Sequence, residues 1–247
     1  MNKIFRYELK RLLWNKFFAG ILAVALFYGW QVLYGETISG VAHTAPFSPW
    51  SFGSYLSRVL PLLWVGALFF LTFFTSGAAR RTSVLTAAAP MPAAKYALAR
   101  CAAALAATAA LAAAVLALAA AFYGRYFGWY HWGSLLPVVG AVLAPPLVFA
   151  LGTGWLLGQL RPWLIYVWMI VPFAAAALPL PQALSMWNGA LFAQLPLQLG
   201  VLDPAFSLPA GVWVVQAALL AGGVLALSMA CRKGPRRHTA PAGDKNR

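Results

Sequence analysis

With 62% hydrophobic and only 9% charged residues, this chain of 247 residues carries too few charges to cover a water-soluble surface, since soluble domains are about 45–50% apolar and about 25% charged. The composition therefore predicts an all-α integral membrane protein, with lipid as the solvent for most of the chain. The 18 Lys and Arg outweigh the four acidic residues, but they lie between apolar runs rather than in one stripe, which favours topology signals and headgroup contacts over nucleic-acid binding.

The first 16 residues are predicted to form a basic amphipathic helix on the membrane surface, an elbow before the first span. Apolar residues recur there at helical spacing, while basic residues project elsewhere. The residues that define this predicted elbow are Phe5, Arg6, Leu9, Lys10, Leu12 and Leu13. The apolar run that follows has span length and lacks a small-x-small cleavage pattern, so we expect the first span to be retained rather than removed as a signal peptide.

Six transmembrane spans are predicted, because the apolar runs approach the roughly 20 residues that cross a bilayer. They cover residues 17–34, 56–77, 101–123, 135–157, 163–178 and 210–230. The third span is dominated by alanine, and we expect it inside the bundle because small side chains allow close helix packing. The fourth span contains Pro145 and Pro146 and is expected to be kinked or partly unwound.

The connections between the spans are predicted to differ in character. Aromatic residues from Phe47 to Tyr55 are expected in a loop at the headgroup boundary. Residues 180–209 are apolar but broken by prolines and amides, so we expect short interfacial or re-entrant helices on the outer side rather than a seventh span. A single transmembrane domain is thus predicted over 1–230, with a basic cytoplasmic loop at 78–100 and a basic tail at 231–247.

The distribution of positive charge predicts the orientation. Of the 18 Lys and Arg, only Arg58 and Arg125 fall in segments assigned to the outside. The positive-inside rule therefore predicts a multi-pass protein of the cytoplasmic (inner) membrane, with both the N- and the C-terminus in the cytoplasm.

Reactive constellations are not found in the sequence. It contains no G-x-x-x-x-G-K-[ST] phosphate loop, and its three histidines fall in predicted loops or in the tail. We therefore expect no catalytic residue, no metal site, no cofactor and no enzymatic activity of the chain itself. Cys101 and Cys231 are expected to be inert helix residues in a reducing compartment.

Polar residues inside the spans are few. Arg58 is predicted either to reach the outer headgroups or to contact Glu36 or an anionic substrate. With Arg58, the residues Thr72, Thr75 and Gln216 are candidates for a substrate path. Hydrogen bonds between helices are the alternative interpretation of these polar positions.

The segment between the second and third spans, from Arg80 to Arg100, reads RRTSVLTAAAPMPAAKYALAR. Two arginines precede a short predicted helix that Pro90 ends, and a second helix with Lys95 and Arg100 leads into the membrane. Together with the elbow, the six spans and the short outer helices, this layout resembles the permease subunits of ABC-2-type ABC transporters, which carry a coupling helix at this place. The family often has an acidic residue and a glycine after the arginine, where this chain has Thr82-Ser83-Val84.

The resemblance implies a function and partners. A permease would export its substrate with ATP hydrolysed by a separate ATP-binding cassette subunit, and it would need a second permease chain, identical or a sister subunit, besides membrane lipids. Contact with the ATPase would be made by Arg81, Thr82, Ser83, Val84, Leu85, Thr86 and Pro90. The alternatives are an intramembrane enzyme, a non-catalytic scaffold or immunity protein, and, for the loop alone, a solvated basic connector.

Overall fold

The computed structural model describes residues 2–76 and 93–232, and these residues form α-helices joined by turns and two short 3-10 helices, without a strand. The α-helices are α1 (Asn2–Leu13), α2 (Lys16–Gly35), α3 (Pro49–Thr75), α5 (Ala93–Phe127), α6 (Leu136–Leu160), α7 (Leu164–Ala177), α8 (Ala190–Leu199) and α9 (Ala210–Arg232). The all-α prediction is confirmed for this part of the chain. The predicted coupling helix and nearly all of the tail at 231–247 lie outside it.

Five of these helices, α2, α3, α5, α6 and α9, are long and apolar enough to cross a membrane, so the chain has the character of a multi-pass membrane protein. Helix α7 occupies the place of the predicted fifth span but has only 14 residues. At 1.5 Å per residue it is about 21 Å long, shorter than the roughly 30 Å hydrocarbon core. The described helices therefore give five spans of full length and one short apolar helix where six spans were predicted.

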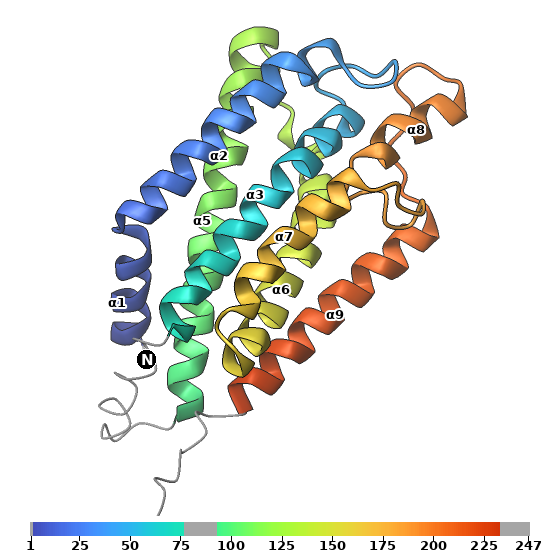
Figure 1. Ribbon diagram of the computed structural model, residues 1–247. Helices are drawn as coiled ribbons and strands as arrows, with labels where there is room; N and C mark the ends of the chain where they lie inside the picture. Colours follow the sequence, from blue (N-terminus) through green and yellow to red (C-terminus); the bar gives the residue numbers. More distant parts are fainter. Residues whose placement is uncertain (1, 77–92, 233–247) are drawn as a thin grey trace, which may run out of the picture.

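The long helices run side by side in one bundle (Figure 1). The start of α1 and the end of α9 lie at the same end, called here the terminal end, and α8 lies at the opposite, distal end. The chain therefore passes along the bundle an even number of times between α1 and the end of α9, as the predicted orientation requires.

Helix α3 lies at the centre of the bundle, where it contacts α2, α5, α6, α7 and α8. Its aromatic residues Trp50, Phe52, Tyr55 and Trp64 are fully buried. In the most apolar stretch of α3, 67% of the residues are buried, compared with 39% in α5. The alanine-rich α5 contacts five other helices, but the large side chains of α3 form more of the core.

Helix α3 begins at Pro49 rather than near residue 56. The side chain of Ser48 caps it by accepting a hydrogen bond from the Ser51 amide at 3.2 Å, and proline is favoured in the first helical turn. The expectation that the aromatic residues up to Tyr55 belong to a boundary loop is wrong for most of them, because Trp50, Phe52 and Tyr55 are buried in the first two turns of α3.

Helices α6 and α9 approach each other through glycine. A Cβ atom added to Gly152 would lie 2.2 Å from the carbonyl oxygen of Gly223, so the two backbones touch, as small residues allow between membrane helices. Helix α6 continues through Pro145 and Pro146, and the expected unwinding of this span does not occur. Each proline removes only one main-chain donor, and both are buried within the bundle.

The region at 180–209 contains a single α-helix, α8, preceded by turns. It packs on the first turns of α3. The ring of Phe192 occupies the space next to Gly53, where a Cβ atom would come within 2.3 Å of it. The indole of Trp50 donates a hydrogen bond to the carbonyl oxygen of Pro204 at 2.8 Å. Where several short helices were expected, the described residues have one α-helix, which covers the distal end of the core, and its place at the outer membrane surface stays a prediction.

Candidate functional site

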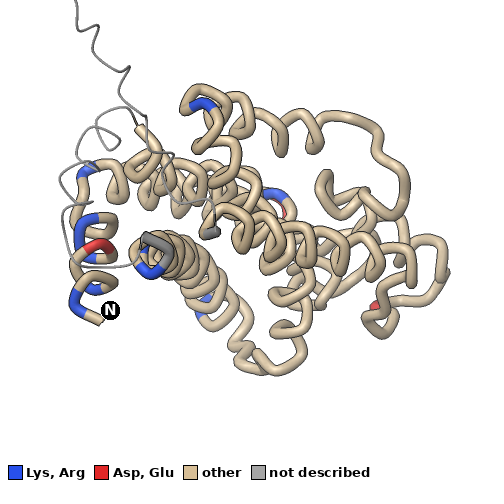
Figure 2. Tube along the Cα trace, turned by 90° about the horizontal axis from the view of Figure 1, so that it is seen from below, with Lys and Arg blue, Asp and Glu red and all other residues tan. Residues whose placement is uncertain are grey.

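Charged residues gather at the terminal end. Figure 2 shows Lys and Arg positions on α1 and on the adjoining end of α5, with an acidic residue among them. Helix α1 packs along the first turns of α5, and Asn15 starts α2 by accepting a hydrogen bond from the Phe17 amide at 3.2 Å. The chain therefore turns between α1 and α2, while α1 lies against α5.

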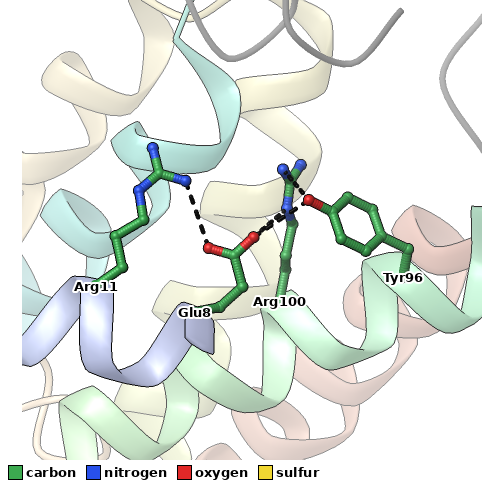
Figure 3. Close-up of polar contacts among 4 residues, drawn as sticks. All are labelled: Glu8, Arg11, Tyr96 and Arg100. Carbon is green, nitrogen blue, oxygen red and sulfur yellow. Dashed lines mark hydrogen bonds and ion pairs between the residues drawn. The ribbon is translucent and has the colours of Figure 1, made fainter. Parts of the chain in front are cut away.

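Glu8 is the centre of a polar cluster between α1 and α5 (Figure 3). Its carboxylate accepts hydrogen bonds from the Tyr96 hydroxyl at 3.2 Å and from Arg100 Nε at 3.3 Å. Its second oxygen lies 3.4 Å from Arg11 Nη1, and Arg100 Nη2 donates to the Tyr96 hydroxyl at 2.6 Å. The four residues Glu8, Arg11, Tyr96 and Arg100 are called here the Glu8 cluster.

The ion pair in the Glu8 cluster is largely withdrawn from solvent. The side chain of Glu8 is 3% exposed and that of Arg100 is 14% exposed, whereas that of Arg11 is 45% exposed. A carboxylate in such a place is stable only when cations and hydrogen-bond donors compensate the lost hydration. Arg100 and Tyr96 provide this compensation, so their geometry fixes the position of α1.

Arg100 also connects the cluster to α3. Its guanidinium carbon lies 5.3 Å from the ring centroid of Phe74 and 4.2 Å from that of Tyr96, which are cation–π distances. The middle of α1, the last turn of α3 and the first turns of α5 thus meet at one side chain. Helices α3 and α5 flank residues 77–92, so the cluster lies where the described chain leaves for and returns from the predicted coupling segment.

Sequence reasoning did not single out Glu8. The signal was present, because Glu8 falls at spacings of three and four residues from Phe5 and Leu12, which are on the apolar side of the helix. An acidic residue in that stripe indicates a buried partner with positive charge. The sequence predicts a helix start with Lys95 and Arg100, but the acidic partner of Arg100 could not be identified without the packing of α1 on α5.

The predicted elbow residues fall into a buried apolar set and an exposed basic set, as their helical periodicity indicates. Leu12 is buried, and Phe5, Leu9 and Leu13 are partly buried against the core, while Arg6 and Lys10 are exposed. Much of the apolar stripe is thus occupied by protein. The contact of this helix with a membrane surface stays a prediction.

The residues of the predicted coupling helix all lie outside the described residues. They are Arg81, Thr82, Ser83, Val84, Leu85, Thr86 and Pro90.

The four candidates for a substrate path are not brought together. The hydroxyls of Thr72 and Thr75 donate to the carbonyls of Phe69 and Leu71 in their own helix. The side-chain amide of Gln216 donates to the Met186 sulfur at 3.2 Å. Arg58 lies at the distal half of α3, where its guanidinium is 3.0 Å from the Glu36 carboxylate. Of the four, only Arg58 lines a cavity of about 380 Å³ in the described bundle.

The two cysteines, expected to be inert helix residues, lie side by side. Cys101 is near the start of α5 and Cys231 near the end of α9, and their sulfurs are 3.8 Å apart. Both are free thiols. Within residues 2–76 and 93–232, no group of three or more His, Cys, Asp and Glu side chains is placed to hold a metal ion.

No protein-family model matches the sequence, and no curated protein and no solved structure matches it either. The resemblance to ABC-2 permeases stays a prediction based on the layout of the sequence.

Proposed function

We propose that this chain is the transmembrane subunit of an ABC-type transporter, which exports a substrate across the cytoplasmic membrane using ATP hydrolysed by a separate subunit. The observation that carries the proposal is the Glu8 cluster, which joins α1 to the first turns of α5 and, through Arg100, to the end of α3. These helix ends flank the segment that the sequence assigns to the ATPase contact. A displacement of that segment would therefore reach three helices at once.

In this mechanism, residues 81–90 dock into a groove on the ATP-binding subunit. Closure of two such subunits on ATP would move the attached spans as rigid bodies. The buried Glu8 carboxylate supports such movement, because a compensated buried charge holds its neighbours in one arrangement and is costly to separate from them. Helices α1, α3 and α5 would then move at the terminal end as one unit.

The proposal includes the assembly and its orientation. We count α7 as a short fifth span, so that six spans form half of a permease pair and the second half is another permease chain, identical or a sister subunit. The terminal end faces the cytoplasm. Arg58 stays the leading candidate for the substrate path, because it lines a cavity, whereas Thr72, Thr75 and Gln216 are engaged in bonds within the bundle.

The chain holds no phosphate loop of the G-x-x-x-x-G-K-[ST] type, which supports a separate source of energy for transport. An intramembrane enzyme or a scaffold would not need an ATPase partner. Purification of the intact complex therefore separates these functions from the proposed one.

The test is co-purification of the tagged chain in a mild detergent from membranes of the cells that produce it. We expect a stoichiometric partner that carries a phosphate loop and binds an ATP analogue, and we expect Leu85→Asp to release it, because a carboxylate would be forced into an apolar contact. Leu202→Asp is the matched control, since Leu202 follows α8 by three residues and is 78% exposed. Absence of an ATPase from the wild-type preparation, or its equal retention by Leu85→Asp, would overturn the proposal.

A further inference from the structure

A cavity of about 380 Å³ lies in the distal half of the bundle, within the range of roughly 300–1,000 Å³ that is usual for small-molecule sites. Helix α3 lies between α2 and α7 (Figure 1), and all three helices line the cavity together with Trp187 and Asn188. Val24 on α2 is 56% exposed and Phe173 on α7 is 46% exposed. The cavity is thus open on the side of the bundle that a membrane would cover with lipid.

The two ends of the cavity differ in polarity. At the distal end, the Arg58 guanidinium lies 3.0 Å from the carboxylate of Glu36, the residue after α2. Toward the terminal end the lining becomes apolar, with Leu62 one helical turn below Arg58 and Val24 on α2. Val24 precedes Glu36 by 12 residues, which is about 18 Å along a helix. This is the profile of an amphiphile, with a charged head and a hydrocarbon chain.

The hydrogen-bond donors of the polar end belong to Arg58, which lines the cavity next to Ser57. The Ser57 hydroxyl is itself buried and has no hydrogen-bond partner among the described residues. Arg58 has five N–H donors, and its one ion pair in the described chain is with Glu36. About half of each side chain in that pair is exposed, and exposed pairs contribute little, so another anion can compete with Glu36.

We propose that this cavity binds an anionic amphiphile of the membrane that has one hydrocarbon chain. The chain lies along Val24, Leu62 and Phe173, and the anionic headgroup, a phosphate or a carboxylate, pairs with Arg58. A helix from a second protein chain would not fit, because its diameter of about 10–12 Å exceeds what a cavity of this volume admits. The inference rests on the cavity alone and does not require an ATPase partner, so a failed co-purification would leave it standing.

The test is native mass spectrometry of the purified full chain in detergent, offered oleoyl lysophosphatidic acid and oleoyl lysophosphatidylcholine in competition. The two lipids have the same hydrocarbon chain and differ in headgroup charge. In a second competition, oleate replaces lysophosphatidic acid and is offered against lysophosphatidylcholine, so that a carboxylate is tested apart from a phosphate. We expect a preference for the anionic lipid of roughly tenfold or more, the value of one charged hydrogen bond. An equal occupancy by both lysophospholipids, together with no preference for oleate, would overturn the proposal.

Variants identify the site. Arg58→Gln should remove the preference, and Glu36→Gln should increase it by releasing the guanidinium from its competitor. Leu62→Trp should reduce binding of every lipid, because it fills the apolar end. Arg125→Gln, at the distal end of α5 and away from the cavity lining, is the matched control and should bind as wild type does. If monodisperse Glu36→Gln and Leu62→Trp bind the lipids as wild type does, Arg58 is only a general headgroup contact and the proposed site is refuted.

Discussion

Glu8 is an acidic residue on the buried side of a basic helix, and its neighbours decide what it contributes. Removal of a carboxylate from water costs several kcal/mol, which only well-placed partners offset. Arg100 lies 3.3 Å away and Tyr96 3.2 Å away, so the carboxylate specifies where α1 lies on α5. A leucine at this position would also be buried, but it would pack against any apolar surface and would not specify where α1 lies.

A first prediction concerns this pair. Glu8→Leu should lower the stability of the bundle by about 3 kcal/mol, because it leaves the Arg100 charge buried without its partner. The double variant Glu8→Leu/Arg100→Met should recover most of that loss, since no charge then stays buried. The measurement is the midpoint of thermal unfolding in detergent, followed by tryptophan fluorescence. A double variant no more stable than Glu8→Leu would show that the cluster is not a compensated charge pair.

The sequence of a helix shows which of its faces is apolar, but it does not show what packs against that face. The spacing of Phe5, Leu9, Leu12 and Leu13 predicts one apolar face, and the structure has these residues on that face. Periodicity cannot say whether lipid or protein covers the face, because both are apolar. The Glu8–Arg100 pair joins positions 92 residues apart, and no local pattern contains such a contact.

The bounds of a helix can be predicted from the sequence where all of the local helix-start and helix-end signals are used. The last two spans are within two residues of their predicted bounds, because proline and polar residues mark their ends. The start of α3 was predicted too late, although Ser48 and Pro49 are a strong pair of helix-start residues. The aromatic residues that follow suggested a boundary loop, but Trp50 packs against Phe192 of α8, and Phe52 and Tyr55 pack against α5.

A second prediction tests the contact between α6 and α9. Gly223→Ala should destabilise the bundle by about 1–3 kcal/mol, the usual cost of overpacking, because a Cβ atom there would lie 2.7 Å from the backbone of Val148. Gly222→Ala is the matched control in the adjacent position. Its Cβ atom would lie 3.5 Å from the Phe149 ring, an ordinary contact, and alanine favours helix by about 1 kcal/mol.

The same unfolding measurement ranks the two variants. Gly223→Ala should unfold at a lower temperature than wild type, and Gly222→Ala at the same temperature or a higher one. The opposite order would mean that α9 presents a different face to α6.

The whole molecule has two polar places that lie at different levels along α3. The Glu8 cluster lies at the terminal end and the Arg58–Glu36 pair in the distal half. Along α3, Arg58 precedes Phe74, the residue that Arg100 contacts, by 16 residues, about 24 Å, and α3 contacts helices at both places. In the proposed transporter, movement that begins beside Glu8 would reach the lipid-facing cavity through this central helix.

Composition alone predicted the membrane class and the all-α fold, because so few charges exclude a soluble surface. The central role of α3 could not be predicted, since every span is apolar and hydropathy does not rank their burial. The cavity was also beyond prediction, because Val24, Arg58 and Phe173 come from three helices and meet only in the bundle.

The proposed transporter requires the predicted coupling segment and the carboxyl-terminal tail to lie on the same, cytoplasmic side of the membrane, and cysteine labelling measures this. Leu85→Cys, Ala240→Cys and His131→Cys would each be made in a Cys101→Ser/Cys231→Ser background, and labelled in intact cells with a membrane-impermeant maleimide. We expect residues 85 and 240 to react only after the membrane is opened, and residue 131 to react from outside. Labelling of residue 85 and residue 240 from opposite sides of the membrane would contradict this expectation.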